Sequence, residues 1–252
     1  MPNNRAHAVS RFYAVERRLL SQENKVNAIR YREIIEGHLA NGYAIEVPYD
    51  QLQLPFGKVW YLPHHFVVTN PNKPNKIRVV FYCSAKFNNV CLNDFLLRGP
   101  VLLSNLTGVL LRSRQYLVAV SADIESMYHR VGVTPKDQSA LRFVWRTPGS
   151  DEPLPTLQMT TQVFGAISSS FWVLQHAVNS NSQFPAVAKK LVDNFYADNL
   201  SDSFETEEEA ILFSKQAVKS LASGGFRLTA FASSSRRLLA SIPPSERSSH
   251  SI

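Results

Sequence analysis

Short runs of hydrophobic residues, bounded by residues that favour turns, predict most of the strands of this chain. Residues 58–69 and 77–83 form two such runs, and the basic segment 70–76, rich in Asn and Pro, connects them. Residues 141–145 and 226–231 predict two further strands. The chain therefore contains several short strands that come from distant parts of the sequence.

Hydrophobic residues recur at helical spacing in other segments. In the first fifty residues one such helical face ends at the stop signal Asn41-Gly42, and we expect this helix to support the rest of the fold. Segments 101–114 and 168–181 predict two more helices. The positions expected to be buried in the first two helices are Tyr31, Ile34, Ile35 and Leu39, and then Leu102, Leu103, Leu106, Leu110 and Leu111.

A fourth predicted helix has a clear start and a clear end. Thr206 and Glu209 form a capping box at its start, and the helix runs to about Ala222. Gly224-Gly225 ends it, because glycine readily adopts the backbone conformation that closes a helix.

The order of these elements is strand, helix, hairpin, helix and strand, which predicts an α+β fold with helices on one face of a sheet. We expect a helical lead-in at 1–50, a strand-rich region at 51–115 and a sheet-and-helix region at 116–232. The tail 233–252 is rich in Ser, Arg and Pro, and we expect it to fray.

Composition narrows the class of protein. The 252 residues are 44% hydrophobic and 19% charged, so the chain can bury a core and lacks the composition of a disordered protein. A net charge of +7 favours a polyanionic partner such as nucleic acid, although many basic domains bind none. Cys83 and Cys91 lack metal-ligand spacing, and we expect them to be packed, reduced thiols inside the cell. No hydrophobic stretch in the sequence approaches the length of a membrane span, and we find no targeting signal.

Two aspartates stand at the ends of hydrophobic runs. Residues 116–120 lead into Asp123, and residues 191–196 lead into Asp198, where the turn dipeptide Asp198-Asn199 and a second run predict a hairpin. If the first strand lies beside this hairpin, two carboxylates converge at one sheet edge and offer the hard oxygen ligands that paired magnesium ions need. The alternatives are a strand-end aspartate that faces water and a simple Asp-Asn turn.

The segments Ser-Ala-Asp-Ile-Glu-Ser-Met-Tyr at 121–128 and Asn-Phe-Tyr-Ala-Asp-Asn-Leu at 194–200 resemble the palm of the reverse transcriptases of BEL/Pao-type LTR retrotransposons. Similar segments follow one another in the family's order over most of the chain. They are 61–65, 78–81, 84–87, 92–94, 99–100, 164–166, 224–229 and 240–243. The resemblance implies a fingers-like region at 51–115 and a palm at 116–232, with an antiparallel palm sheet and helices on one face.

The resemblance also implies a metal site. Asp123, Asp198 and the backbone carbonyl of Ile124 are expected to hold two Mg²⁺ ions, with Mn²⁺ as a substitute. Asn199 occupies a catalytic position where the family pattern has a second aspartate. An amide oxygen can coordinate magnesium but brings no negative charge, so we expect weaker metal occupancy.

Four residues are expected to contact the incoming nucleotide by the same resemblance. Lys76 and Arg78 would hold its triphosphate, since a guanidinium fork matches phosphate oxygens. Tyr128 would lie under the sugar and clash with a 2′-hydroxyl, and Gly165 would let the backbone approach the nucleotide. The alternatives are solvated surface charges at 76 and 78 and an ordinary packed tyrosine at 128.

Further departures from the family pattern accompany Asn199. Tyr82 replaces an aspartate, and Ala230 replaces a lysine that would protonate the leaving pyrophosphate. Residues 168–170 are Ser-Ser-Ser where the family has Ser-Ser-Pro, which removes a proline favoured in a first helical turn. Loss of a general acid removes about 10²–10⁴ of rate, so together these changes indicate erosion of an enzyme.

The resulting hypothesis is a reverse transcriptase fragment, an RNA-directed DNA polymerase by descent, with activity impaired by Asn199 and Ala230. Its expected partners are a primed RNA or DNA template and a dNTP, and not a membrane, and its expected location is the cytoplasm. The alternatives are a non-catalytic nucleic-acid-binding remnant of a retroelement polyprotein and an unstable relic. The sequence gives no indication of oligomeric state.

Overall fold

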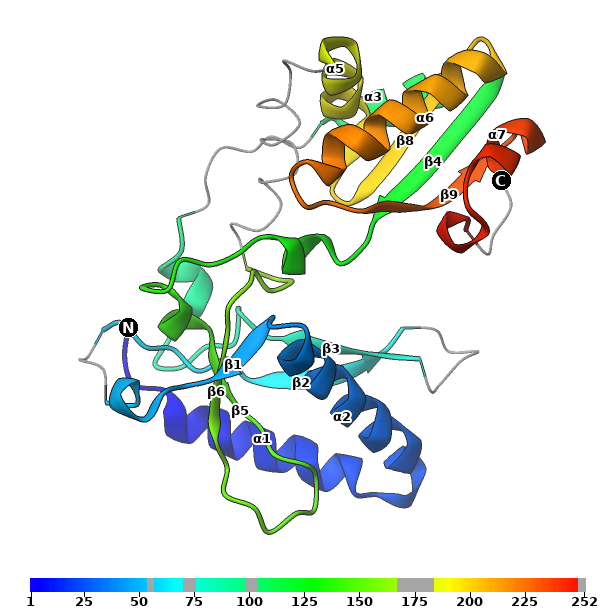
Figure 1. Cartoon of the computed structure of the whole chain (residues 1–252). Coiled ribbons are helices and arrows are strands. Elements are labelled where there is room, and N and C mark those ends of the chain that lie inside the picture. The colour runs from blue at the N-terminus through cyan, green and yellow to red at the C-terminus, as the bar shows by residue number, and fades with distance from the viewer. Residues whose placement is uncertain (54–56, 70–75, 98–103, 167–183, 249–252) are drawn as a thin grey trace. The chain divides into compact units, whose positions relative to one another are not determined.

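The computed structural model describes residues 1–53, 57–69, 76–97, 104–166 and 184–248, which belong to two compact units (Figure 1). The first unit comprises Met1–Leu97 and Val131–Ser169, and the second comprises Arg98–Arg130 and Ser170–Ile252. The predicted helix at 168–181 and most of the predicted loop at 70–76 lie outside the described residues. The division expected at residues 50, 115 and 232 stays a prediction. In the part of the chain that the structure describes, no helix is long and apolar enough to cross a membrane.

The first unit begins with two helices, α1 (Arg5–Leu19) and α2 (Lys25–Ala40), joined by a short 3₁₀ turn (Gln22–Asn24). Gly42 follows α2 with a φ of +70°, which confirms the predicted stop. Of the positions expected to be buried in this region, Tyr31 and Ile35 are buried, Ile34 is half-buried and Leu39 is exposed.

Two small antiparallel sheets complete the first unit. The strands β2 (His64–Val68) and β3 (Ile77–Phe81) pair with each other and lie within the predicted strands 58–69 and 77–83. A second sheet has the order β1 (Ala44–Glu46), β6 (Thr156–Met159) and β5 (Arg142–Val144). The sequence predicted β5 but not β1 or β6. Further 3₁₀ turns cover Tyr49–Gln51, Leu92–Asp94 and Gln138–Leu141.

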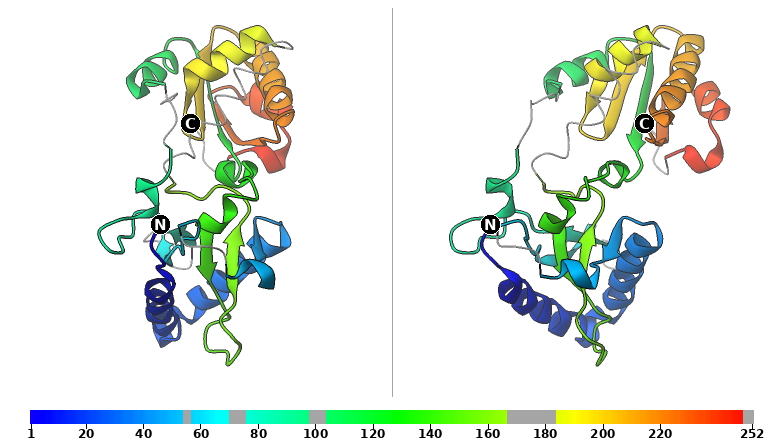
Figure 2. Two further views of the ribbon diagram at one scale, coloured as in Figure 1. Left: turned by 90° about the vertical axis from the view of Figure 1, so that its left-hand side faces the viewer. Right: turned by 60° about the vertical axis from the view of Figure 1, so that its left-hand side comes forward.

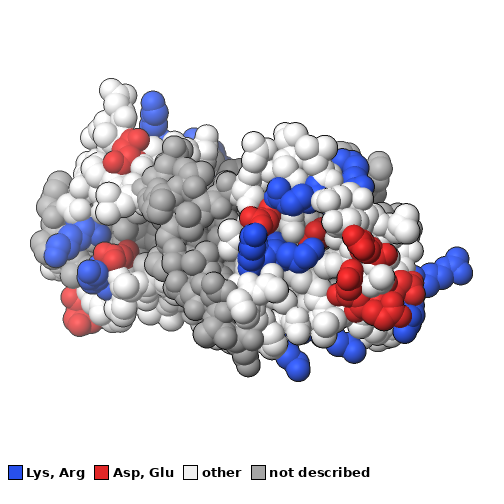
Figure 3. Space-filling view, turned by 90° about the horizontal axis from the view of Figure 1, so that it is seen from above, with Lys and Arg blue, Asp and Glu red and all other residues white. Residues whose placement is uncertain are grey.

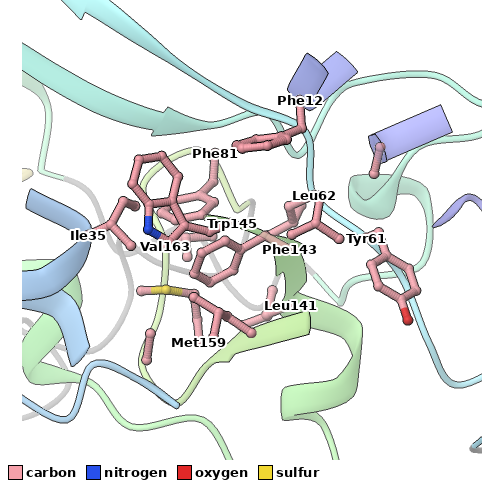
Figure 4. Packing of buried hydrophobic residues seen from close by; sticks show 14 of the residues in the cluster. Phe12, Ile35, Tyr61, Leu62, Phe81, Leu141, Phe143, Trp145, Met159 and Val163 are labelled. Carbon is pink, nitrogen blue, oxygen red and sulfur yellow. The ribbon is translucent and has the colours of Figure 1, made fainter. Parts of the chain in front are cut away.

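Aromatic side chains fill the core of the first unit, as Figure 4 shows around Phe81, Phe143 and Trp145. The rings of Phe81 and Phe143 meet edge to face with centroids 5.0 Å apart. Cys83 also lies in this core, and burial raises the pKa of its thiol to about 12. It therefore stays protonated and packs as an apolar group.

His64 is a fully buried polar group in the same core. Its Nε2 donates to the carbonyl of Val144 at 2.8 Å, so its Nδ1 accepts a hydrogen bond from the hydroxyl of Tyr31. Burial lowers the pKa of His64 to about 4, and the ring is neutral near pH 7.

The second unit contains an antiparallel sheet with the order β7 (Phe195–Tyr196), β8 (Asn199–Phe204), β4 (Val118–Ile124) and β9 (Leu228–Ser233). Its helices are α3 (Leu106–Arg112), α5 (Pro185–Asn194), α6 (Glu207–Ala222) and α7 (Arg236–Ser241). Helix α6 packs along β4, β8 and β9, and it keeps that place in both views of Figure 2. The chain is therefore α+β, with an antiparallel sheet covered by helix, as the sequence predicted.

Local sequence explains the two elements that hold this sheet together. Along β4 alternate residues are buried, so Val120, Ala122 and Ile124 face the core while Asp123 lies on the opposite, less buried face. Helix α6 begins at the expected cap, where the backbone amide of Glu209 donates to the hydroxyl of Thr206 at 3.3 Å.

The structure corrects the predicted hairpin. Leu191 and Val192 belong to α5 and not to a strand, and only Phe195–Tyr196 pairs with β8. Since Tyr196 pairs with Asn199, the two turn residues are Ala197 and Asp198 rather than Asp198 and Asn199.

Helix α3 and the C-terminal segment also differ from expectation. Residues 98–103 lie outside the described residues, and Leu106, Leu110 and Leu111 of α3 are exposed rather than buried. The expected frayed tail instead forms α7 and a 3₁₀ turn (Pro244–Glu246), because Leu238 and Ile242 supply buried apolar anchors.

Candidate active site

Asp123 lies near the end of β4, between two neighbouring strands. It pairs with Asn199 on β8 on one side and with Thr229 on β9 on the other. The register to β9 shifts by one residue between Ser121 and Asp123, and Ala230 has a left-handed φ of +52° there. This bulge at the sheet edge changes the direction of β9 next to the aspartate.

The β7–β8 turn carries the second aspartate to the same edge. The backbone amide of Ile124 donates to the carbonyl of Asp198 at 3.0 Å, so Asp198 is bonded to the residue that directly follows Asp123. Ala197 closes the turn with a left-handed φ of +55°. The structure therefore brings together the three positions predicted to be catalytic, 123, 198 and 199.

The side chains of the turn already interact with each other. The Asn199 amide donates from Nδ2 to Oδ1 of Asp198 at 2.7 Å. Asp123 and Asp198 are half-buried and Asn199 is exposed, so all three sites lie at the surface of the second unit.

The donor set suits a hard cation. Two carboxylates, the Ile124 carbonyl and an amide oxygen are the oxygen ligands that Mg²⁺ takes in proteins. Among the described residues no group of three His, Cys, Asp or Glu side chains could hold a metal ion. The residues present fit magnesium chemically, with one negative charge fewer than a site of three aspartates.

Glu125 does not supply that missing charge. Its carboxylate lies 3.0 Å from Nη1 of Arg227 and 3.0 Å from Nη2 of Arg130. No role was predicted for Glu125, because no local sequence pattern indicates its pairing with a residue 102 positions away.

Tyr128 lies in the 3₁₀ turn Met127–Arg130 that follows β4, within the same unit as Asp123. Ser126 starts this turn with a left-handed φ of +51°, and Tyr128 is half-buried.

The remaining predicted nucleotide contacts belong to the first unit. Lys76 and Arg78 are exposed; Lys76 directly precedes β3, Arg78 lies in it, and buried Ile77 separates them. The Lys76 carbonyl accepts hydrogen bonds from the backbone amide and the hydroxyl of Thr69, both at 3.0 Å, which closes the base of the hairpin.

Gly165 adopts a φ of +97°, a conformation that favours glycine. Its carbonyl accepts a hydrogen bond from Nδ2 of Asn93 at 3.1 Å, and a Cβ at this position would lie 3.6 Å from the carbonyl of Phe81. Gly165 is thus packed beside the backbone that leads into Tyr82, one of the departures from the family pattern.

An ion pair between a buried aspartate and a partly exposed lysine supports β8, and it was not predicted from the sequence. Asp202 is almost fully buried and lies 3.0 Å from Nζ of Lys190 on α5. Its alternation with Leu200 and Phe204 was a usable signal, because an acid on a buried strand face requires a partner.

Charge is not gathered into one basic stripe on the face shown in Figure 3, where lysine and arginine side chains are interspersed with acidic ones. The net charge of +7 therefore does not by itself outline a nucleic-acid groove on that face.

The α+β fold of the chain is similar to that of solved reverse transcriptase structures. A solved structure of the foamy viral protease-reverse transcriptase in complex with an RNA/DNA hybrid matches 80% of this chain and 23% of that chain, with a TM-score of 0.59 and 16% identity. Two further structures of that protein, both in complex with double-stranded DNA, match 79% of this chain and 30% or 35% of theirs. Their TM-scores are 0.59 and 0.57, and both are 17% identical. The chain therefore spans about a quarter to a third of the length of these neighbours, and the likeness at this identity concerns the fold.

No protein-family model matches the chain, and no curated protein matches it either.

Proposed function

We propose that this chain is a fragment of a BEL/Pao-type retrotransposon reverse transcriptase with weakened activity. Its reaction would be RNA-directed DNA synthesis, in which a primer 3′-hydroxyl attacks the α-phosphate of a dNTP and pyrophosphate leaves.

The observation that supports this most is the register of the second-unit sheet. Asp123 pairs across the ladder with Asn199, and the Ile124 amide binds the carbonyl of Asp198. Two aspartates about seventy-five residues apart in the chain therefore lie at one edge of the sheet, which supports a phosphoryl-transfer site there.

Asp123, Asp198 and the carbonyl of Ile124 would hold Mg²⁺, with Mn²⁺ as a substitute, and the bound metal would supply Lewis-acid activation of the primer hydroxyl and charge stabilisation.

We assign four residues to the dNTP. Lys76 and Arg78 would bind the triphosphate through their exposed charges, and Arg78 can do so in a bidentate manner. Tyr128 would exclude a 2′-hydroxyl. Gly165 would allow close approach of the backbone because it has no side chain, and its φ of +97° favours glycine.

Asn199 is the reason for proposing weak activity. It lowers the ligand charge of the site by one, and loss of one well-placed electrostatic group costs on the order of 10²–10³ in rate. Ala230, which occupies the bulge of β9, cannot act as an acid toward a leaving pyrophosphate.

The second candidate is a non-catalytic nucleic-acid-binding remnant. The hydrogen bond from Asn199 to Asp198 favours it, because it fills one carboxylate oxygen without any metal. The neighbours in complex with an RNA/DNA hybrid and with double-stranded DNA suggest primed RNA or DNA as the partner.

Binding and extension should be measured together on a labelled DNA primer annealed to RNA, with Mg²⁺ or Mn²⁺, for the native chain and Asp123→Ala. Extension by the native chain that is lost in Asp123→Ala would establish a working polymerase. Binding without extension would favour the remnant. If neither binding nor extension occurs, the proposed function is wrong.

A further inference from the structure

Four charged side chains form an ion-pair network in the second unit: Glu125, Arg130, Arg227 and Glu246. Arg227 is its centre. Its Nη1 lies 3.1 and 3.0 Å from the two carboxylate oxygens of Glu125, and its Nη2 donates to Oε1 of Glu246. The backbone joins the same pair, since the amide of Glu125 donates to the carbonyl of Arg227 at 3.0 Å.

The network touches the candidate metal site from two sides. Glu125 follows Ile124 directly, and Thr229, which pairs with Asp123 across the ladder, is two residues beyond Arg227. The hydrogen bond from Arg227 lowers the pKa of Glu246. Glu246 is therefore bound to the residue that directly precedes β9.

Glu246 belongs to the C-terminal segment 236–248, which the sequence predicted to fray. The buried side chains of Leu238 and Ile242 anchor the start of this segment. Its end is anchored by a hydrogen bond from the amide of Ser248 to the carbonyl of Phe231 at 2.8 Å. Between these anchors the packing is incomplete, because a cavity of about 420 Å³ lies between α6, β9 and the segment. Arg227 and Glu246 both line it, so their ion pair joins the segment to β9 where close apolar packing is missing.

We propose that Arg227 is a positioning residue for the metal site. By pairing with Glu125 and Glu246 it fastens the C-terminal segment to the end of β4 and so fixes the backbone that presents Asp123 and the Ile124 carbonyl. This inference rests on the proposed function of that site. It also explains why Glu125 is no substitute for the missing third aspartate, since two arginines hold its carboxylate.

The side chains of Glu125 and Arg227 are 40% and 49% exposed, and isolated pairs at such sites contribute little. The network differs from an isolated pair because one guanidinium binds two carboxylates and contacts both oxygens of one of them. Its effect should therefore be local order at the strand end rather than global stability.

The test compares Arg227→Met, Arg227→Lys and Glu246→Gln with a matched control, Arg237→Met. Arg237 is also an exposed arginine of the second unit that pairs with two glutamates, Glu207 and Glu208, but it lies on α7. Hydrogen exchange at the amides of Ile124 and Glu125 is read first, in low salt, where surface ion pairs are least screened. Mn²⁺ affinity is measured second. Each substitution is tested in two backgrounds, the native sequence and Asn199→Asp.

We expect Arg227→Met and Glu246→Gln to speed exchange at both amides about threefold or more, while Arg237→Met leaves it unchanged. Mn²⁺ should bind about tenfold more weakly in Arg227→Met, with partial recovery in Arg227→Lys. Unchanged exchange would overturn the proposal, and so would faster exchange with unchanged Mn²⁺ affinity, because that outcome describes a purely structural contact.

Asp123→Ala separates this inference from the proposed function. If it abolishes Mn²⁺ binding while Arg227→Met does not alter it, the metal site is correct and the positioning role is wrong. If Asp123→Ala leaves Mn²⁺ binding intact, the proposed function fails, and the positioning role fails with it.

Discussion

Replacing Asn199 with aspartate should make the free protein less stable and the metal-bound protein more stable. Asn199 donates to Asp198 at 2.7 Å, so the substitution removes a charge-assisted hydrogen bond and sets two carboxylates side by side. The new charge should also strengthen metal binding at the edge formed by Asp123 and Asp198.

The size of the effect follows from the geometry and exposure of the turn. Two like charges about 4 Å apart repel by about 1 kcal/mol in water and about 4 kcal/mol near a protein surface. Because Asn199 is exposed, we expect the lower part of this range, about 1–2 kcal/mol with the lost hydrogen bond included. Metal at about 100 times its dissociation constant raises the free energy of unfolding by about 2.7 kcal/mol, which exceeds the destabilisation of about 1–2 kcal/mol.

Thermal unfolding with and without Mn²⁺ measures both effects. Without metal the midpoint of Asn199→Asp should fall by about 2–8 °C, since each kcal/mol shifts it by about 2–4 °C at this size. With saturating Mn²⁺ it should rise above the native midpoint. A variant that is as stable as the native chain without metal, or that gains nothing from Mn²⁺, would refute the assignment of position 199 to a metal site.

Four further outcomes follow from the structure. Gly165→Ala should destabilise the first unit by about 1–2 kcal/mol in urea unfolding, because a φ of +97° strains an alanine. Gly37→Ala, in the open interior of α2, should stabilise the unit slightly. Equal effects of the two substitutions would argue against backbone strain at position 165. Ala230→Gly should raise the thermal midpoint of the second unit, since Ala230 has a φ of +52°, and a lower midpoint would contradict this. The pKa of His64 is about 4 in the folded protein, below its ordinary 6.5, so neutral His64 contributes fully to the free energy of unfolding above pH 6.5. About 3 kcal/mol of this free energy should be lost as the pH falls from 6.5 through 4. A free energy of unfolding in urea that stays constant from about pH 7 to 4 would disprove this. Tyr128→Val, in the Asn199→Asp background, should raise ribonucleotide incorporation relative to deoxynucleotides in primer extension, and an unchanged ratio would support a packing role instead.

Local sequence patterns were sufficient to predict the helices and strands for which several signals indicate the same structure. The hydrophobic run before Asp123 predicted the strand β4, and the Thr206 cap predicted the start of α6, because a hydrophobic run and a satisfied helix end are local properties. The run at 191–196 was ambiguous, since a short apolar run fits a strand or a buried helix equally well. Burial of Ala188 and Leu191 on one face shows why the helix forms.

The candidate site was predictable in its carboxylates but not in their surroundings. Asp123 and Asp198 each follow an apolar run, which a reader of the sequence can see. The pairing of Glu125 with Arg227 joins residues 102 apart through the register of β4 and β9, and that register depends on a bulge. No local pattern encodes such a contact, and the same reason explains why Glu246 in the C-terminal segment was overlooked.

The most direct test of the account is single-nucleotide addition to a DNA primer on an RNA template by Asn199→Asp, compared with the native chain in Mg²⁺. The account predicts that restoring the aspartate raises the rate by about 10²–10³, and that adding Asp123→Ala to this variant abolishes the gain. If Asn199→Asp binds Mn²⁺ and the primed template yet adds no nucleotide faster than the native chain, these residues do not form a polymerase site.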